Sequence, residues 1–145
     1  MKILSITLLA AGLTTGIFAS RQAPIPPQSA QDYIKIKTER VQHNEAGLTK
    51  AKESYMKLMS RKRRTPEETQ GILLDLVNAI QSVRIPYAAL TLADPTALTP
   101  EESQMIEDLN KREKDSLAQL KDIEQKAKSW AEKNNIEYPK SRMMF

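Results

Sequence analysis

The sequence predicts an all-α protein, an antiparallel three-helix bundle with long helices. Apolar residues recur three and four positions apart along three extended segments, which is the helical period. A Thr-Pro-Glu-Glu element, typical of a helix start, precedes two of these segments, and no segment shows the alternation of a strand. With 145 residues the chain has room for one domain, and packing alone must stabilise it because it has no cysteine.

Composition also limits the chemistry that the chain can perform. The absence of cysteine excludes thiolate catalysis, Fe–S clusters and cysteine-based zinc sites. A single histidine, His43, disfavours a histidine-based metal site or a Ser-His-Asp triad, and we interpret it as a surface residue. No catalytic motif is present. We therefore expect a protein that is not an enzyme and needs neither a cofactor nor a metal.

The first residues have the pattern of a secretory signal peptide. Met1 and Lys2 supply a positive start, residues 3–20 carry no charge, and the run over 3–13 is strongly apolar. We predict a signal peptide over 1–19, cleaved after Ala19 or Ser20, and hence a secreted or periplasmic protein. The alternative is an uncleaved membrane anchor, although the apolar run is short for a hydrocarbon core of roughly 30 Å. No later segment is long and apolar enough to span a bilayer.

Residues 20–28 form a proline-rich tether, and the first predicted helix covers about 29–63. Ser29 is its expected N-cap. Lys37 and Asn44 interrupt the apolar stripe, so the first half of this helix should pack more weakly than the second. The stripe consists of Ile34, Val41, Leu48, Ala51, Tyr55, Leu58 and Met59.

The second helix is predicted over 66–92, with Thr65 and Glu68 forming a capping box. Pro86 should kink it, because proline lacks the N–H that a helix interior needs. From residue 72 to residue 93 only Asp75 and Arg84 are charged, so the helix is apolar nearly all round.

The third helix is predicted over about 100–135, again with a threonine cap, at Thr99. Its apolar stripe is set among charges of both signs. Asn134 and Asn135 suit its C-terminal end. The bundle would thus span 29–138, followed by a flexible tail over 139–145.

Because the predicted second helix is apolar nearly all round, part of its apolar surface could remain exposed and bind a protein partner. In a three-helix bundle each helix buries only part of its circumference, so the remainder could meet a client protein or a second copy of the chain, as in a homodimer. Alternatively, long Lys and Arg stems on the neighbouring helices cover it. The candidate residues are Ile72, Leu74, Val77, Ile85 and Leu92.

Positive charge is concentrated on the first helix and the turn that follows it. Residues 29–64 hold ten basic and four acidic residues, a net charge of +6. The candidates for binding an anionic surface are Arg61, Lys62, Arg63 and Arg64. The alternative is that this cluster only compensates the helix dipole and pairs with the acidic helices. Nucleic acid is not the expected partner, because no aromatic residues interleave the cluster to stack on bases.

One segment resembles a known family. Residues 98–102, Leu-Thr-Pro-Glu-Glu, are similar to the Leu-Thr-x-x-Gln motif of the Spy and CpxP group of periplasmic stress chaperones, with Glu102 in place of glutamine. The element at 65–68 lacks both the leucine and the glutamine. This resemblance implies a small helical dimer that shields unfolded clients.

Together these patterns predict an exported, non-enzymatic helical binding protein. It would be chaperone-like or a homo-oligomeric scaffold, and it would act through the apolar second helix. The alternative is association with an anionic envelope or lipid surface through the basic first helix and residues 61–64.

Overall fold

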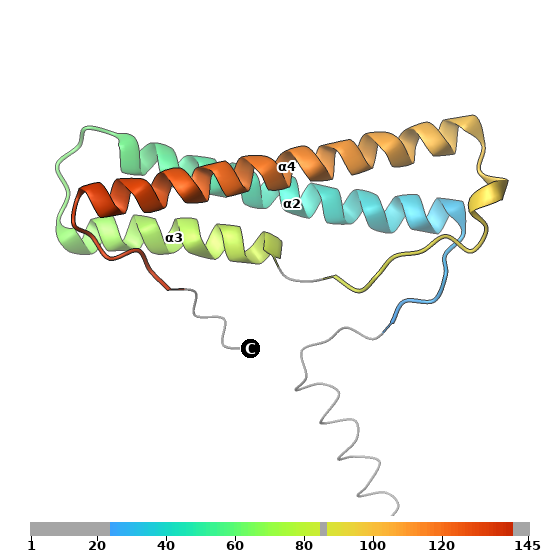
Figure 1. Cartoon of the computed structure of the whole chain (residues 1–145), viewed down its shortest axis with the longest axis horizontal. Coiled ribbons are helices and arrows are strands. Elements are labelled where there is room, and N and C mark those ends of the chain that lie inside the picture. The colour runs from blue at the N-terminus through green and yellow to red at the C-terminus, as the bar shows by residue number, and fades with distance from the viewer. Residues whose placement is uncertain (1–23, 85–86, 141–145) are drawn as a thin grey trace, which may run out of the picture.

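The computed structural model describes residues 24–84 and 87–140, and this part of the chain is all-α. Its elements are α2 (Ala30–Met59), α3 (Pro66–Arg84), the single turn η1 (Pro95–Ala97) and α4 (Pro100–Lys133). The three long helices pack together, and α2 contacts both α3 and α4 (Figure 1). This confirms the predicted all-α bundle of three helices. The predicted signal peptide and its cleavage site lie outside the described residues.

The helices are arranged around α2. Figure 1 shows α4 running beside α2 in the same direction along its whole length, whereas the shorter α3 returns along the second half of α2. No helix among the described residues is long and apolar enough to cross a membrane. The central position of α2 means that it carries most of the contacts between helices.

Local capping explains where the helices begin. The Ser29 hydroxyl accepts a hydrogen bond from the Asp32 N–H (3.2 Å) at the start of α2. Before α4, the Glu102 N–H donates to the Thr99 hydroxyl (3.1 Å) and the Thr99 N–H donates to the Glu102 carboxylate (3.1 Å). Thr65 and Glu68 exchange the same two bonds before α3. These bonds satisfy N–H groups that a helix start leaves without partners.

The ends of the first two helices come earlier than predicted. α2 ends at Met59, and the backbone at Ser60 is already extended, so the basic residues 61–64 lie in the loop rather than in the helix. α3 ends at Arg84, and the expected helical continuation to Leu92 is wrong, because residues 87–94 contain no α-helix. A proline two residues beyond Arg84 disfavours helix at the residue before it and cannot donate the next helical bond.

An extended crossing therefore replaces the last part of the predicted helix. Residues 87–94 run back towards the start of α2, where they meet the proline-rich segment. The Gln28 N–H donates to the Thr91 carbonyl (2.9 Å) and the Ala93 N–H donates to the Gln28 carbonyl (2.8 Å), which makes one parallel bridge between Gln28 and Leu92. The tether thus holds the crossing beside the bundle.

The main core lies where all three helices run side by side. It is formed by Leu48, Ala51, Leu58, Leu73, Leu76, Ala79, Ile80, Val83, Leu120, Ile123 and Ala127. The first half of α2 faces α4 through more polar contacts instead. Lys37 pairs with Glu113, and the Arg112 guanidinium forms two hydrogen bonds with the Glu45 carboxylate (2.8 and 2.7 Å). This division agrees with the two polar interruptions in the apolar stripe.

Gly47 sits at the closest approach of α2 to α3, and we expect its replacement by alanine to destabilise the fold. An added Cβ would lie 2.2 Å from Cγ2 of the buried, β-branched Val83. Overpacking of this kind costs about 1–3 kcal/mol, while the gain in helix propensity is about 1 kcal/mol. A net loss of about 1 kcal/mol in the free energy of unfolding is the expected result in urea titrations.

Gly71 provides the matched control for this prediction. It is exposed on α3, and a Cβ there would meet nothing within 4 Å, so Gly71→Ala should stabilise the protein by about 1 kcal/mol. The double variant Gly47→Ala/Val83→Ala should lose less than the two single variants summed. Equal stability of the two glycine variants would show that Val83 moves aside without cost.

Asn44 is a polar residue in the apolar seam of α2. Its side chain is 3% exposed, and Oδ1 has no hydrogen-bond partner among the described residues. A buried polar atom without a partner carries a desolvation cost of about 1–3 kcal/mol. We therefore expect Asn44→Leu to raise the free energy of unfolding by about 1 kcal/mol, whereas the exposed Asn110→Leu should change it little. A loss of stability in Asn44→Leu would contradict this assignment.

Candidate functional site

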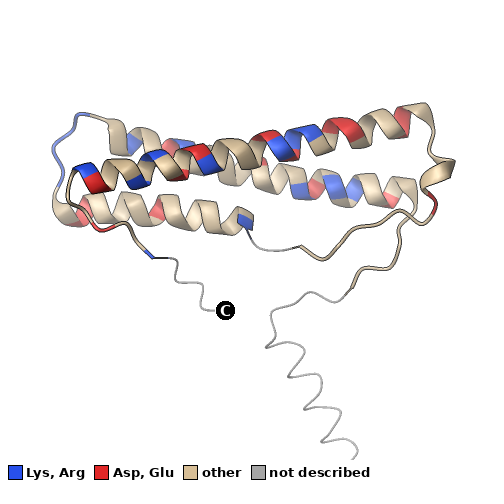
Figure 2. Ribbon diagram, in the orientation of Figure 1, with Lys and Arg blue, Asp and Glu red and all other residues tan. Residues whose placement is uncertain are grey.

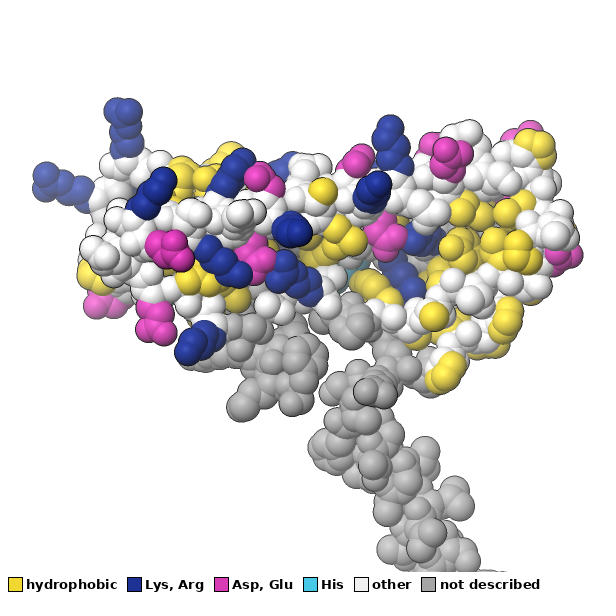
Figure 3. All heavy atoms as spheres, viewed as in Figure 1, with side chains coloured by type: hydrophobic (Ala, Val, Ile, Leu, Met, Phe, Trp, Pro, Cys, Tyr) yellow, Lys and Arg dark blue, Asp and Glu magenta, His cyan; other side chains and the backbone are white. Residues whose placement is uncertain are grey.

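The basic loop, residues 61–64, connects α2 to α3 at one end of the bundle (Figure 2). Arg61, Lys62 and Arg63 are exposed, and they form no ion pair or hydrogen bond with the other described residues. Figure 3 shows basic side chains projecting into solvent from this end of the molecule. The loop therefore presents a concentrated positive charge.

Arg64 has a different role from the other three residues of the loop. Its guanidinium donates to the Leu58 carbonyl (3.3 Å) and the Ser60 carbonyl (3.3 Å), and it also bonds the Lys57 carbonyl. These are carbonyl groups that the end of α2 leaves without helical partners. Arg64 thus stabilises the end of α2, as expected for a basic residue that compensates the helix dipole.

Apolar side chains lie next to the basic loop. Met56 is 66% exposed and Met59 39% exposed at the end of α2. An open groove of about 560 Å³ lies beside Met56, and the half-buried Ile72 of α3 also lines it. The groove is lined by Glu53, Met56, Lys57, Ser60, Lys62, Arg64 and Ile72. Ile72, one of the predicted apolar candidates, thus lines the same groove as Lys62 and Arg64 of the basic loop.

The other apolar candidates do not share this surface. Val77 is 4% exposed and belongs to the buried set, while Leu74 is half-buried. Leu92 lies in the crossing, paired with Gln28, and Ile85 lies outside the described residues. Within residues 24–84 and 87–140, the large apolar side chains with high exposure belong to α2 and α4. These are Met56, Met59, Met105 and Leu117. α3 therefore has much less spare apolar surface than its sequence indicates.

The C-terminal segment, residues 136–140, accounts for this difference. It folds back after α4, and Ile136 and Tyr138 pack against the main core. The Gln70 side chain of α3 donates to the Glu137 carbonyl (3.1 Å). The predicted bundle, residues 29–138, includes both of these residues, but the sequence pattern assigned them no contact with α3. Two apolar residues two positions apart directly after a helix are the signal that could have identified an extended, inward-facing segment.

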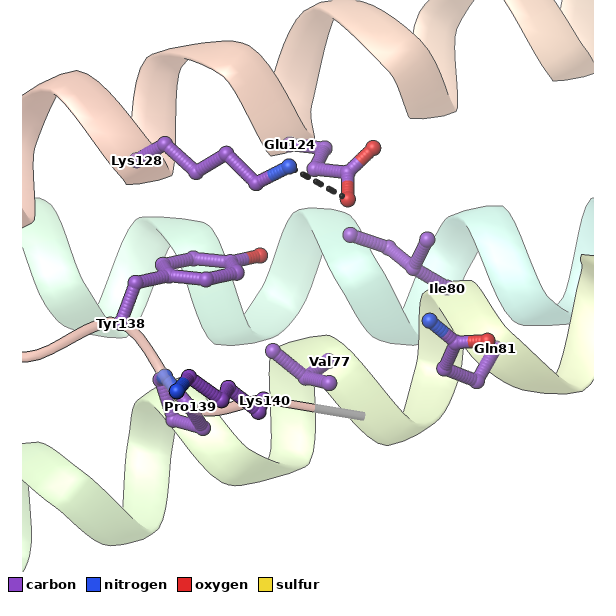
Figure 4. Close-up of a pocket in the computed structure, with 8 residues that line it drawn as sticks. All are labelled: Val77, Ile80, Gln81, Glu124, Lys128, Tyr138, Pro139 and Lys140. Carbon is purple, nitrogen blue, oxygen red and sulfur yellow. Dashed lines mark ion pairs between the residues drawn. The ribbon is translucent and has the colours of Figure 1, made fainter. Parts of the chain in front are cut away.

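Tyr138 lies between α3 and α4, beside a cavity of about 330 Å³ (Figure 4). Burial raises the pKa of Tyr138 to about 12, and the neighbouring Glu124 carboxylate adds to the shift. Although burial acts in the opposite sense, hydrogen bonds from Arg84 and Lys128 hold the pKa of Glu124 below its usual value. The Lys128 ammonium also lies 5.6 Å from the centre of the Tyr138 ring. The tyrosine ring thus sits in a partly buried, charge-lined position.

The raised pKa predicts that the fold loses stability at high pH. The folded state holds the Tyr138 proton more tightly than the unfolded state, in which the tyrosine pKa is near 10. The stability that this difference contributes to the fold is therefore fully present below about pH 10. It should be lost as the pH rises towards about 12. We expect urea titrations of Tyr138→Phe to show a smaller loss of stability over this range than those of the wild type. An identical pH dependence would contradict the prediction.

The described residues include one histidine, His43. They contain no group of three His, Cys, Asp or Glu side chains placed to hold a metal ion. Nε2 of His43 lies 3.0 Å from the Ser82 carbonyl near the end of α3, and its ring is nearly perpendicular to that of Tyr87, with the two ring centres 6.3 Å apart. His43 therefore contacts α3 and the crossing, in addition to being exposed as predicted.

No protein-family model matches the sequence, and no curated protein or solved structure matches it either. A functional proposal therefore depends on the contacts and charges described above.

Proposed function

We propose that this chain is an exported, non-enzymatic helical binding protein that associates with an anionic envelope or lipid surface through its basic loop. The observation that carries the proposal is the group of three exposed, unpaired cations, Arg61, Lys62 and Arg63, beside the exposed Met56. Anionic lipid surfaces attract such clusters with about 1 kcal/mol per basic residue.

Several cations elsewhere in the bundle are paired with a carboxylate on another helix. Lys37 pairs with Glu113, Arg84 with Glu124 and Arg112 with Glu45, and each pair joins two helices. A cation that already has a carboxylate partner gains less from a second anion, because the first partner offsets its charge. Lys111 and Lys114 of α4 are also exposed without an ion pair, but in the basic loop three such cations are consecutive, which supports the loop as the attachment point.

Apolar side chains beside the loop favour a lipid surface. Met56 and the groove next to Ile72 could take up apolar atoms, since methionine adapts its shape readily to different contacts. A soluble polyanion would use the charge of the loop alone. The combination of charge and apolar surface therefore supports a membrane with anionic headgroups over other anionic partners.

Client shielding, or a homo-oligomeric scaffold built on α3, has less support. Both need an apolar face on α3, whereas Val77 is buried and Ile136 and Tyr138 pack against the main core. The exposed methionines at the end of α2 offer apolar surface, but they adjoin the basic loop. The proposal therefore places binding at the end of the bundle and not along α3.

Sedimentation with lipid vesicles tests the proposal. We expect the chain to bind vesicles rich in anionic lipid, to leave zwitterionic vesicles unbound, and to dissociate as salt rises from about 0.1 M to 1 M, since the screening length falls from about 10 to 3 Å. Binding to a soluble polyanion such as polyphosphate should be weaker at equal charge. Equal binding to both kinds of vesicle, or no binding to either, would overturn the proposal.

A further inference from the structure

The groove between α3 and α4 is filled by the chain's own C-terminal segment. Both helices pack along α2, yet they make few contacts with each other. Tyr138 occupies the space between them, Ile136 packs against the main core, and Val77 and Ile80 of α3 line the cavity beside Tyr138 (Figure 4). A segment of extended chain thus completes the bundle in place of direct packing between helices.

Few polar contacts hold this segment in the groove. Gln70 donates to the Glu137 carbonyl, which is a main-chain acceptor, and Lys128 lies over the Tyr138 ring. The side chains of Ile136 and Tyr138 supply the apolar contacts. Each of these interactions links the segment to α3, α4 or the core. None of them depends on the segment belonging to the same molecule as the groove.

A tight turn connects α4 to the segment. α4 ends at Lys133, and the Ile136 N–H donates to the Ala131 carbonyl (2.9 Å), so the chain reverses over Asn134 and Asn135. Asn135 has a φ of 53°, in the left-handed region, and it is the one non-glycine residue of the described part with a positive φ. Asparagine tolerates the left-handed region better than most residues with a side chain, but unlike glycine it still has a cost there, under about 1 kcal/mol. Opening the turn would release this cost.

We propose that the groove between α3 and α4 also accepts the C-terminal segment of a second copy of this chain, so that two copies exchange residues 136–140. Exchange keeps every contact between segment and groove, because the two segments are identical. It relaxes the two turns at Asn135, and short connections under strain favour exchange of this kind. This surface and its partner are independent of the basic loop.

Crosslinking between differently substituted chains tests the exchange. Because the protein has no cysteine, Gln70→Cys and Glu137→Cys each introduce a single thiol at an exposed position. An isotopically labelled Gln70→Cys chain is mixed with an unlabelled Glu137→Cys chain and treated with a short bis-maleimide. Mass spectrometry then counts the crosslinks that join one chain of each kind. The control pair is Gln70→Cys with Gln119→Cys, whose thiol lies on exposed α4 surface.

Exchange predicts at least tenfold more mixed crosslinks in the test pair than in the control pair. It also predicts a yield that rises with protein concentration, because assembly competes with the intramolecular arrangement. The turn supplies a second measurement. Asn135→Ala, which disfavours the left-handed turn, should raise the mixed yield, and Asn135→Gly, which tolerates it, should lower the yield. Mixed yields equal to the control would overturn the proposal.

Discussion

Leu76→Ala should lower the free energy of unfolding by about 3 kcal/mol, the largest stability effect that we expect in this bundle. Leu76 lies on α3 and is 0% exposed within the main core. Truncating a buried leucine costs the transfer of its apolar atoms and leaves a cavity, with a typical total of about 2–5 kcal/mol. Urea titration followed by circular dichroism measures the loss directly.

Leu74 is the matched control, two residues away on the same helix. It is half-buried, so Leu74→Ala should cost about 1 kcal/mol, and Leu74→Glu should leave the protein folded. If Leu74→Ala costs as much as Leu76→Ala, the side chain belongs to the core, and a partner could not use it. A difference of about 2 kcal/mol between the two variants would confirm that α3 has one fully buried and one accessible row.

Local signals made the helix starts predictable. The capping bonds of Thr65 and Thr99 involve residues three positions apart, so the Thr-Pro-Glu-Glu pattern contains everything that forms them. The apolar spacing of α2 likewise identified Leu48, Ala51 and Leu58 as core residues, because helical period alone places them on one face. Lys37 and Asn44 marked the more polar half of the same helix for the same reason.

Tertiary contacts decided what the sequence could not predict. The apolar residues over 87–93 fit a helical period, but in the structure they form an extended crossing in which residues 91–93 pair with Gln28, more than sixty positions earlier. The cover over α3 comes from Ile136 and Tyr138, which are far from α3 in sequence. Periodicity within one segment contains no information on either pairing.

For the basic loop, the position of the charge could be predicted from the sequence, but the role of each residue could not. Four consecutive basic residues indicated positive charge at the end of the first helix, and the charge is there. Their separate roles depend on atomic contacts: Arg64 bonds the last carbonyls of α2, whereas Arg61, Lys62 and Arg63 are left exposed. Only the folded structure distinguishes the residue that stabilises the helix from the three that are free to bind.

Replacing those three cations should produce the largest functional effect. In the triple variant Arg61→Gln/Lys62→Gln/Arg63→Gln, affinity for anionic vesicles should fall by roughly a hundredfold, since each basic residue near a lipid surface contributes about 1 kcal/mol. Stability should change little, because none of the three forms an ion pair or hydrogen bond with the other described residues. Vesicle sedimentation measures the affinity, and urea titration checks that the fold is intact.

A second triple variant separates the position of the charge from its amount. Lys111, Lys114 and Lys121 are exposed on α4, and replacing them by glutamine removes the same three charges from a chain whose net charge is +4. If the loop is the attachment point, this variant should keep most of the wild-type affinity, because at about 0.1 M salt charges beyond about 10 Å from the surface are screened. An equal loss in both variants would mean that overall charge, and not the basic loop, draws the protein to the membrane.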